Sequence, residues 1–195
     1  MTTNTPIEPH PLEPFLPEGA RVLMLGSFPP KRERWSMEFF YPNCQNDMWR
    51  IVGLLFFGDK SHFEIVQERR FDRERIVDFC TRKGIALYDT AAAVKRLKDN
   101  ASDKFLEIVT PTDVAALLAQ IPHCEAVVTT GQRATDVIVE QFCCSSPAIG
   151  SYTTLHLPRG PIRFWRMPST LRAYPLSLDK KALHYRHLFT TEQLL

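Results

Sequence analysis

The fold is first indicated by RVLML at residues 21–25, which GSFPP follows at residues 26–30. The short apolar run predicts a strand buried on both faces, and the glycine and two prolines that follow predict a rigid loop. Strands of this kind are typical of parallel sheets that helices cover on both faces. Residues 21–30 therefore indicate an α/β architecture with a loop at the carboxyl end of its first strand.

Strand and helix patterns alternate along the rest of the chain. Apolar runs predict strands over 85–88, 126–130, 152–157 and 162–166, the last two joined by a turn over 158–161. Helices are predicted over 46–57, 72–83, 110–121 with Pro111 in the first position, 131–142, and from a Ser177 cap to about 189. This order predicts a three-layer α/β/α fold with a central, mostly parallel four-stranded sheet.

The composition fits one globular domain, since the chain has 195 residues, 44% of them hydrophobic. Residues 1–19 hold five of the 15 prolines, which predicts an extended or disordered arm before a single domain over 20–195. The sequence contains no run of 18 apolar residues, so no membrane helix is predicted. The first residues do not have the pattern of a signal peptide. The five cysteines lack paired spacing, which favours a reducing compartment, and we expect a cytoplasmic monomer.

Charge is distributed unevenly along the chain, although the formal net charge is only +2. Residues 151–189 contain seven Lys or Arg residues and one acidic residue, whereas residues 101–150 contain two basic and six acidic ones. A basic face of this kind permits nucleic-acid binding, and scattered solvated charges are the alternative.

Ligands of parallel sheets bind beyond the carboxyl ends of the strands, so the loops there are candidate sites. The first such loop continues into an aromatic segment with Phe39, Phe40 and Tyr41, close to Asn43 and Asn46. Aromatic faces stack on nucleobases, and amide side chains both donate and accept hydrogen bonds at base edges. The alternative is that Phe39 and Phe40 belong to the core and that Asn46 only caps a helix.

The loop after the last predicted strand, residues 167–175, contains Ser169, Thr170, Leu171 and Arg172. The two hydroxyl groups suit contacts with a phosphate, and Leu171 suits an apolar wedge between bases. The alternative is an ordinary polar loop with Leu171 folded inward.

Together these two loops resemble the uracil-DNA glycosylase superfamily, most closely its hypoxanthine-DNA glycosylase and mismatch-specific (G:T/U) branch. LGSFP at residues 25–29 is similar to that family's loop after the first strand. NCQNDMW at residues 43–49 keeps the Asn and Trp of the family's His-Pro-x-Asn-x-Phe-Trp, and MPSTL at 167–171 keeps the Pro, Ser and wedge Leu of its second motif.

The resemblance implies a DNA glycosylase that removes hypoxanthine or uracil from damaged or mismatched duplex DNA, or from single strands, in base excision repair, with no cofactor. It implies that Asn46 acts in catalysis, with Ser27 and Phe28 where other branches keep their water-activating residue. Phe40 and Tyr41 would stack on the flipped base, Ser169 would hold a phosphate, and Leu171 would fill the gap in the helix. Further implied contacts are Gly26, Phe28 and Asn43 with the base, and Pro168, Thr170, Arg172 and Gln132 with DNA.

Three positions depart from the family pattern. Phe28 stands where stronger enzymes have a carboxylate or amide, and Met167 and Asn43 each stand where the family has a His. Two other functions therefore stay open. One is a DNA-damage sensor without catalysis, and the other is a small-molecule hydrolase that uses Cys44 or a histidine.

Other polar residues predict less specific chemistry. The cysteines show no C-x-x-C spacing, so no iron–sulfur cluster or other metal site is expected, and His184 and His187 are the only histidines with a helical spacing. Asp89, after the strand over 85–88, is equally consistent with a ligand contact and with a cap of the segment that follows.

Overall fold

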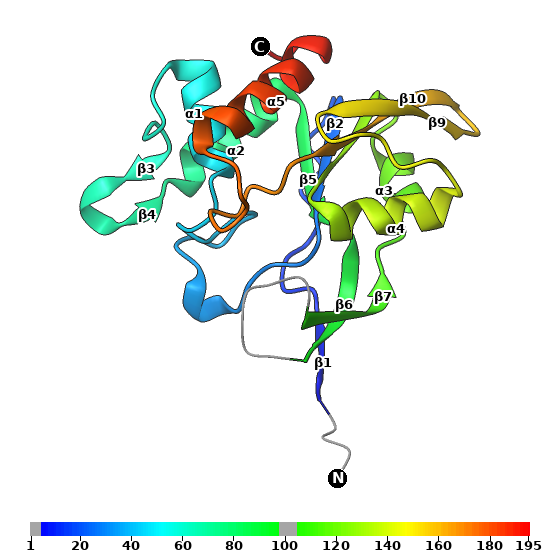
Figure 1. Cartoon of the computed structure of the whole chain (residues 1–195), viewed down its shortest axis with the longest axis horizontal. Helices are drawn as coiled ribbons and strands as arrows, with labels where there is room; N and C mark the ends of the chain where they lie inside the picture. The colour runs from blue at the N-terminus through cyan, green and yellow to red at the C-terminus, as the bar shows by residue number, and fades with distance from the viewer. Residues whose placement is uncertain (1–4, 98–104) are drawn as a thin grey trace.

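The computed structural model describes residues 5–97 and 105–195; residues 1–4 and 98–104 lie outside the described part (Figure 1). Its central sheet has the strand order β5-β2-β8-β10-β9. The strands are β2 (Val22–Gly26), β5 (Ile85–Asp89), β8 (Ala126–Thr130), β9 (Ser151–Leu157) and β10 (Gly160–Met167). The buried runs predicted from the sequence form this sheet, and β2, β5 and β8 are buried along their whole length.

The prediction of a mostly parallel four-stranded sheet is wrong, because the sheet has five strands and is mixed. The first four are parallel neighbours, but β9 pairs antiparallel with β10, with Leu157 opposite Gly160. A tight turn at 158–159 connects β9 and β10 as a hairpin, so no crossover helix lies between these strands.

Helices cover both faces of the sheet, as the alternating pattern predicted. In Figure 1, α1, α2 and α5 gather on one side of the sheet, and α3 and α4 lie on the other. Their bounds are α1 Met48–Phe57, α2 Arg73–Lys83, α3 Val114–Gln120, α4 Gln132–Phe142 and α5 Leu178–Thr191. The Ser177 cap is confirmed, since its hydroxyl accepts the Lys180 N–H at 3.4 Å.

The start of α3 differs from the prediction. Pro111 ends a strand and pairs with Ala91, so it does not open the helix. Asp113 caps α3 instead, and its side chain accepts the Ala116 N–H at 2.9 Å. Residues up to Pro111 form a strand because their pairing with β6 continues to Pro111. The helix can therefore begin only beyond this residue.

Two smaller sheets flank the domain. The first has the order β1-β6-β7, from β1 (Ile7–Pro9), β6 (Ala91–Arg96) and β7 (Leu106–Pro111). It incorporates the proline-rich arm, because β1 pairs antiparallel with β6, and Phe15 forms a bridge with Leu87. The second is a hairpin of β3 (Glu64–Ile65) and β4 (Arg70–Phe71), and two short 3-10 helices span Arg32–Arg34 and Val66–Glu68.

A buried acidic side chain closes the end of the fold opposite the strand-end loops. Glu192 follows α5, and its side chain is 1% exposed. It accepts hydrogen bonds from Arg163 at 2.6 and 2.7 Å and from the Trp165 indole at 2.7 Å. This contact joins the C-terminal residues to β10.

Candidate active site

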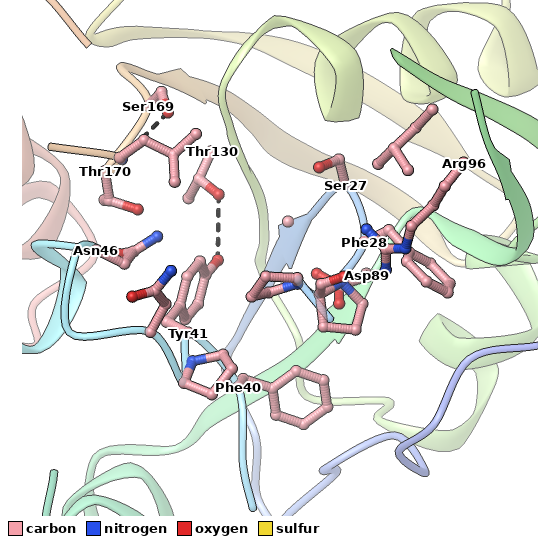
Figure 2. A pocket seen from close by; sticks show the side chains of 17 residues that line it. Ser27, Phe28, Phe40, Tyr41, Asn46, Asp89, Arg96, Thr130, Ser169 and Thr170 are labelled. Atoms are coloured by element: carbon pink, nitrogen blue, oxygen red, sulfur yellow. Dashed lines mark hydrogen bonds between the residues drawn. The ribbon is translucent and has the colours of Figure 1, made fainter. Parts of the chain in front are cut away.

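One pocket lies at the carboxyl ends of β2, β5 and β8, as expected for a sheet of this kind. The pocket opens to solvent, and its cavity volume is about 70 Å³. Figure 2 shows its lining. The lining residues are 26–30, 40–43, 46, 89, 96, 106, 130 and 169–171.

The two loops singled out in the sequence are paired directly, although more than 120 residues separate them in the chain. Asn46 and Leu171 form an antiparallel bridge. The Asp47 N–H donates to the Thr170 carbonyl at 2.8 Å, and the Arg172 N–H donates to the Gln45 carbonyl at 2.9 Å. Backbone hydrogen bonds therefore hold the two motifs in one register on the same wall of the pocket.

A buried ion pair anchors this junction. The ammonium group of Lys181, on α5, is 3.0 Å from Asp47 Oδ2, and the two side chains are 0% and 7% exposed. The same Nζ donates to the Leu171 carbonyl at 2.8 Å. Lys181 thus connects the last helix to both loops.

Asn46 presents a hydrogen-bond donor to the pocket and also supports the start of α1. It is 9% exposed, and its Oδ1 accepts the Met48 N–H at 2.9 Å. Because Oδ1 is used in this way, the amide nitrogen is the free end of the side chain, and Figure 2 shows it directed into the pocket. Capping and ligand binding, which the sequence left as alternatives, are compatible in one side chain.

Aromatic rings form much of the remaining wall. Tyr41 adopts a positive φ of 51°, and its hydroxyl lies 3.2 Å from Thr130 Oγ1. Burial raises the pKa of Tyr41 far above its usual range, so the hydroxyl stays protonated. Phe40 lines the pocket and also packs edge-on against Phe39 and Tyr88. Phe39 is not part of the lining, so of the two phenylalanines only Phe40 reaches the pocket.

Phe28 forms the opposite wall with a cation that the sequence did not single out. The guanidinium of Arg96 lies 5.4 Å from the centre of the Phe28 ring. Arg96 also donates to Glu8 at 2.8 Å and to the Pro29 carbonyl at 2.7 Å. Arg96 is on β6, a strand that the sequence did not predict, because its run of alanines carries no alternating pattern.

Asp89 enters the same pocket from the end of β5, and it makes a contact with the N-terminal arm. Asp89 Oδ2 is 2.9 Å from Nε2 of His10, and the side chains of His10 and Asp89 are 3% and 9% exposed. The carbonyl of Asp89 accepts the Thr112 hydroxyl at 2.7 Å. The segment that Asp89 would cap is strand β6, and the Asp89 side chain pairs with His10 instead, so the cap does not fit this geometry.

The other sequence candidates are divided between the pocket and its surroundings. Gly26, Ser27, Asn43, Ser169 and Thr170 line it, together with the residues already described. Pro168, Arg172 and Gln132 do not. Pro168 is buried and its carbonyl accepts the Tyr185 hydroxyl at 3.0 Å. Arg172 is exposed, and its Nε lies 3.5 Å from Asp47 Oδ1. Gln132 is also exposed, and its amide nitrogen donates to Asp136 Oδ1.

Three of the seven basic residues in 151–189 are engaged in contacts within the fold. Lys181 is buried, and Arg163 is paired with Glu192. Arg159 donates to backbone carbonyls, among them that of Cys124 at 2.6 Å. These three cations therefore stabilise the fold, whereas Arg172 is exposed beside the paired loops.

Within the described residues, no group of three or more His, Cys, Asp or Glu side chains is arranged to hold a metal ion. All five cysteines are free. The Cys44 thiol donates to the Arg69 carbonyl at 3.3 Å, outside the pocket lining. None of the described helices is long and apolar enough to cross a membrane.

Comparison with known proteins places this fold. No family model and no curated protein matches the chain. Among solved structures, it resembles the solution NMR structure of a Methanosarcina acetivorans protein that is provisionally named a uracil DNA glycosylase. The two chains are 19% identical with a TM-score of 0.60, over 94% of this chain and 99% of the other. The protein thus has the mixed α/β fold of that structure.

Proposed function

We propose that this protein is a DNA glycosylase of the hypoxanthine-DNA or mismatch-specific branch. Its reaction is hydrolysis of the N-glycosidic bond of a deaminated or mismatched base, hypoxanthine or uracil, after the nucleotide has flipped out of DNA. We further propose that it acts as a cytoplasmic monomer in base excision repair. The observation that carries the proposal is the pairing of the Asn46 and Leu171 loops across one aromatic pocket.

The pocket walls suit a flipped base. Phe40, Tyr41 and Phe28 offer apolar and aromatic surface for a planar ring. The Asn46 amide nitrogen is placed to donate to an acceptor on the base edge, as a uracil or hypoxanthine carbonyl provides. As the glycosidic bond breaks, negative charge collects on the departing base, and a fixed donor that needs no reorganisation stabilises it.

The paired loop supplies the contacts that open the duplex. Leu171 is half-buried, lines the pocket and lies on the backbone bridge, which fixes its backbone beside Asn46. An apolar side chain inserted into the stack offsets part of the few kcal/mol that flipping costs. Ser169 and Arg172 lie on either side of it and suit contacts with backbone phosphates.

The test is an excision assay on labelled duplexes that carry uracil, hypoxanthine, xanthine or a G·T mispair, followed by alkaline cleavage. The expected result is cleavage at one or more deaminated bases. Asn46→Ala should abolish it, and Asn46→Asp should do so without loss of fold, because Asp keeps the oxygen that accepts the Met48 N–H and replaces the donor with a charged acceptor that repels the departing base. Excision that survives in Asn46→Asp would remove the amide from the mechanism.

A non-catalytic damage sensor is the second candidate, and one observation favours it. Phe28 occupies the loop position of a water-activating residue, and Met167 is buried at 1% exposure, so neither supplies a polar group to the reacting bond. Tight, salt-sensitive binding to the same duplexes without any cleavage would support the sensor. No cleavage and no salt-dependent binding would favour a small-molecule hydrolase.

A further inference from the structure

A carboxylate enters the pocket from a strand that lies outside both sequence motifs. In the register of the sheet, Asp89 is the residue opposite Gly26, at the ends of β5 and β2. Both residues therefore lie where a ligand of this sheet binds, and Asp89 lines the pocket. The first loop has Phe28 where a carboxylate or amide would activate water, but the neighbouring strand brings a carboxylate to the same place.

Gly26 allows this approach because it has no side chain. A Cβ atom built at Gly26 would overlap Asp89 Oδ1, and it would also lie 3.8 Å from the Tyr41 ring. The φ angle of Gly26 is not positive, so the backbone conformation does not itself require glycine here. The space above the Gly26 Cα is thus filled by one oxygen of the Asp89 carboxylate, which faces the pocket.

The other carboxylate oxygen is held by the arm. Oδ2 is the atom that lies 2.9 Å from His10 Nε2. The other ring nitrogen, Nδ1, lies 2.8 Å from the Leu12 carbonyl oxygen and 3.1 Å from the Leu12 backbone nitrogen, so the backbone of Leu12 holds the ring from its other side. The His10 ring is fixed by packing against Tyr88 at 4.5 Å and Phe28 at 5.2 Å. Within residues 5–97 and 105–195, no hydrogen bond is made to Oδ1, so that oxygen is available to a ligand.

We propose that Asp89 is the catalytic base that activates water for the glycosylase reaction, and that His10 is the residue that positions it. This assignment rests on the proposed function. In the step, Asp89 Oδ1 accepts a proton from water as the water oxygen bonds to C1′ of the flipped nucleotide. The bond between C1′ and the base nitrogen breaks, and its electron pair leaves with the base, which the Asn46 amide stabilises.

The placement of the two side chains supports this division of roles. In Figure 2, Asn46 and Asp89 approach the pocket from different sides, with Tyr41 between them. Water must attack C1′ from the face opposite the departing base, so the water-activating group and the base-binding group have to lie on different sides of the glycosidic bond. A positioned general base contributes on the order of 10²–10⁴-fold to a rate.

The first test compares wild-type protein with Asp89→Asn, which keeps the shape of the side chain and removes its basicity. Single-turnover excision is measured on the duplex that the wild type cleaves best, and affinity is measured on a duplex with a tetrahydrofuran abasic analogue. The expected result is a loss of at least about 100-fold in rate with affinity within about threefold. A rate within threefold of wild type, or an equal loss of affinity, would overturn the assignment.

Gly26→Ala provides a second measurement that does not depend on the folding of Asp89→Asn. The added methyl group would displace Asp89 Oδ1 and leave both members of the pair chemically intact. We expect a rate loss of at least about tenfold, the lower end of what misplacing a catalytic group costs. A wild-type rate in Gly26→Ala would contradict the position given to Oδ1.

His10 is tested with a pair of variants. His10→Phe keeps a ring against Tyr88 and Phe28 but removes the donor, whereas His10→Gln keeps an N–H donor. We expect His10→Phe to lower the excision rate at least about tenfold with unchanged affinity, and His10→Gln to restore most of it. The control is Glu8→Gln, which loosens the arm at Arg96 without touching Asp89. Equal losses in Glu8→Gln and His10→Phe would show that His10 only fastens the arm.

Failure of this inference is distinct from failure of the proposed function. If the wild type cleaves none of the duplexes, the glycosylase proposal itself fails. If the wild type cleaves and Asp89→Asn cleaves equally well, the glycosylase proposal stands and the role of Asp89 is rejected.

Discussion

The buried pair of Asp47 and Lys181 should carry a large share of the stability of the loop junction. The perturbation is Lys181→Met, which keeps the length of the side chain and removes the ammonium group. Lys181 is 0% exposed, and its Nζ contacts Asp47 and the Leu171 carbonyl. Removing one member of a buried ion pair costs about 3–5 kcal/mol, because the other charge stays in a site with little water.

The two single variants should differ in a way that the surroundings of each charge determine. After Lys181→Met, Asp47 keeps two cations within reach, Arg172 at 3.5 Å and Arg50 at 3.8 Å. We therefore expect Lys181→Met to lower the free energy of unfolding by about 3 kcal/mol, the lower end of the range. After Asp47→Asn, the ammonium group of Lys181 keeps only neutral oxygen acceptors and no opposite charge, so a loss of about 5 kcal/mol is expected. For a chain of this length these losses correspond to melting temperatures lower by about 6–12 °C and about 10–20 °C.

The assay is urea unfolding followed by circular dichroism, with thermal melts as a second measure. The double variant Asp47→Asn/Lys181→Met should recover most of the loss, since it leaves no unpaired buried charge, and the coupling energy should exceed about 2 kcal/mol. A cost below about 1 kcal/mol for Lys181→Met, or single losses that simply add in the double variant, would refute the reasoning.

Three further outcomes are expected. Leu171→Ala should slow excision more on paired duplex, by about tenfold or more, than on single strands, because only a duplex needs a wedge; equal losses on both would contradict it. Glu192→Gln should cost about 2 kcal/mol in urea unfolding, since its arginine partner is one-third exposed, and should leave excision within about twofold of wild type. Burial raises the pKa of Cys124 to about 11, so at pH 8 about one thiol in a thousand is ionised. Alkylation of the folded protein, followed by mass spectrometry, should therefore label the exposed Cys143 and spare Cys124.

Most of the regular elements of the central domain could be predicted from local pattern. Runs such as 126–130 are apolar enough to be buried on both faces, and the capping residue Ser177 starts its helix where the sequence indicates. The strands β6 and β7 could not be predicted in this way. Their residues are partly exposed and irregular in register, and they are strands because they pair with each other and with the arm.

The residues of the candidate site likewise fall into those that local sequence predicts and those that it does not. Asn46, Phe40, Tyr41 and Ser169 could be proposed because each belongs to a short motif whose residues are neighbours in the chain, and all four line the pocket. Arg96 had no such motif. The charge count over 151–189 could not tell that Lys181 and Arg163 pair with acidic side chains, because composition does not tell which cations contact acids.

By itself, the sequence determined the alternation of buried strands and covering helices, and the two loops that meet at the pocket. Apolar periodicity, capping residues and glycine–proline punctuation act over a few residues, so the chain carries that information locally. Only the tertiary structure decided that Asp89 and His10, 79 residues apart in the chain, form a buried pair at the floor of the pocket. That contact depends on the register of β5 against β2 and on the pairing of β1 with β6, and hydrogen bonds between distant segments leave no periodic signal in the sequence.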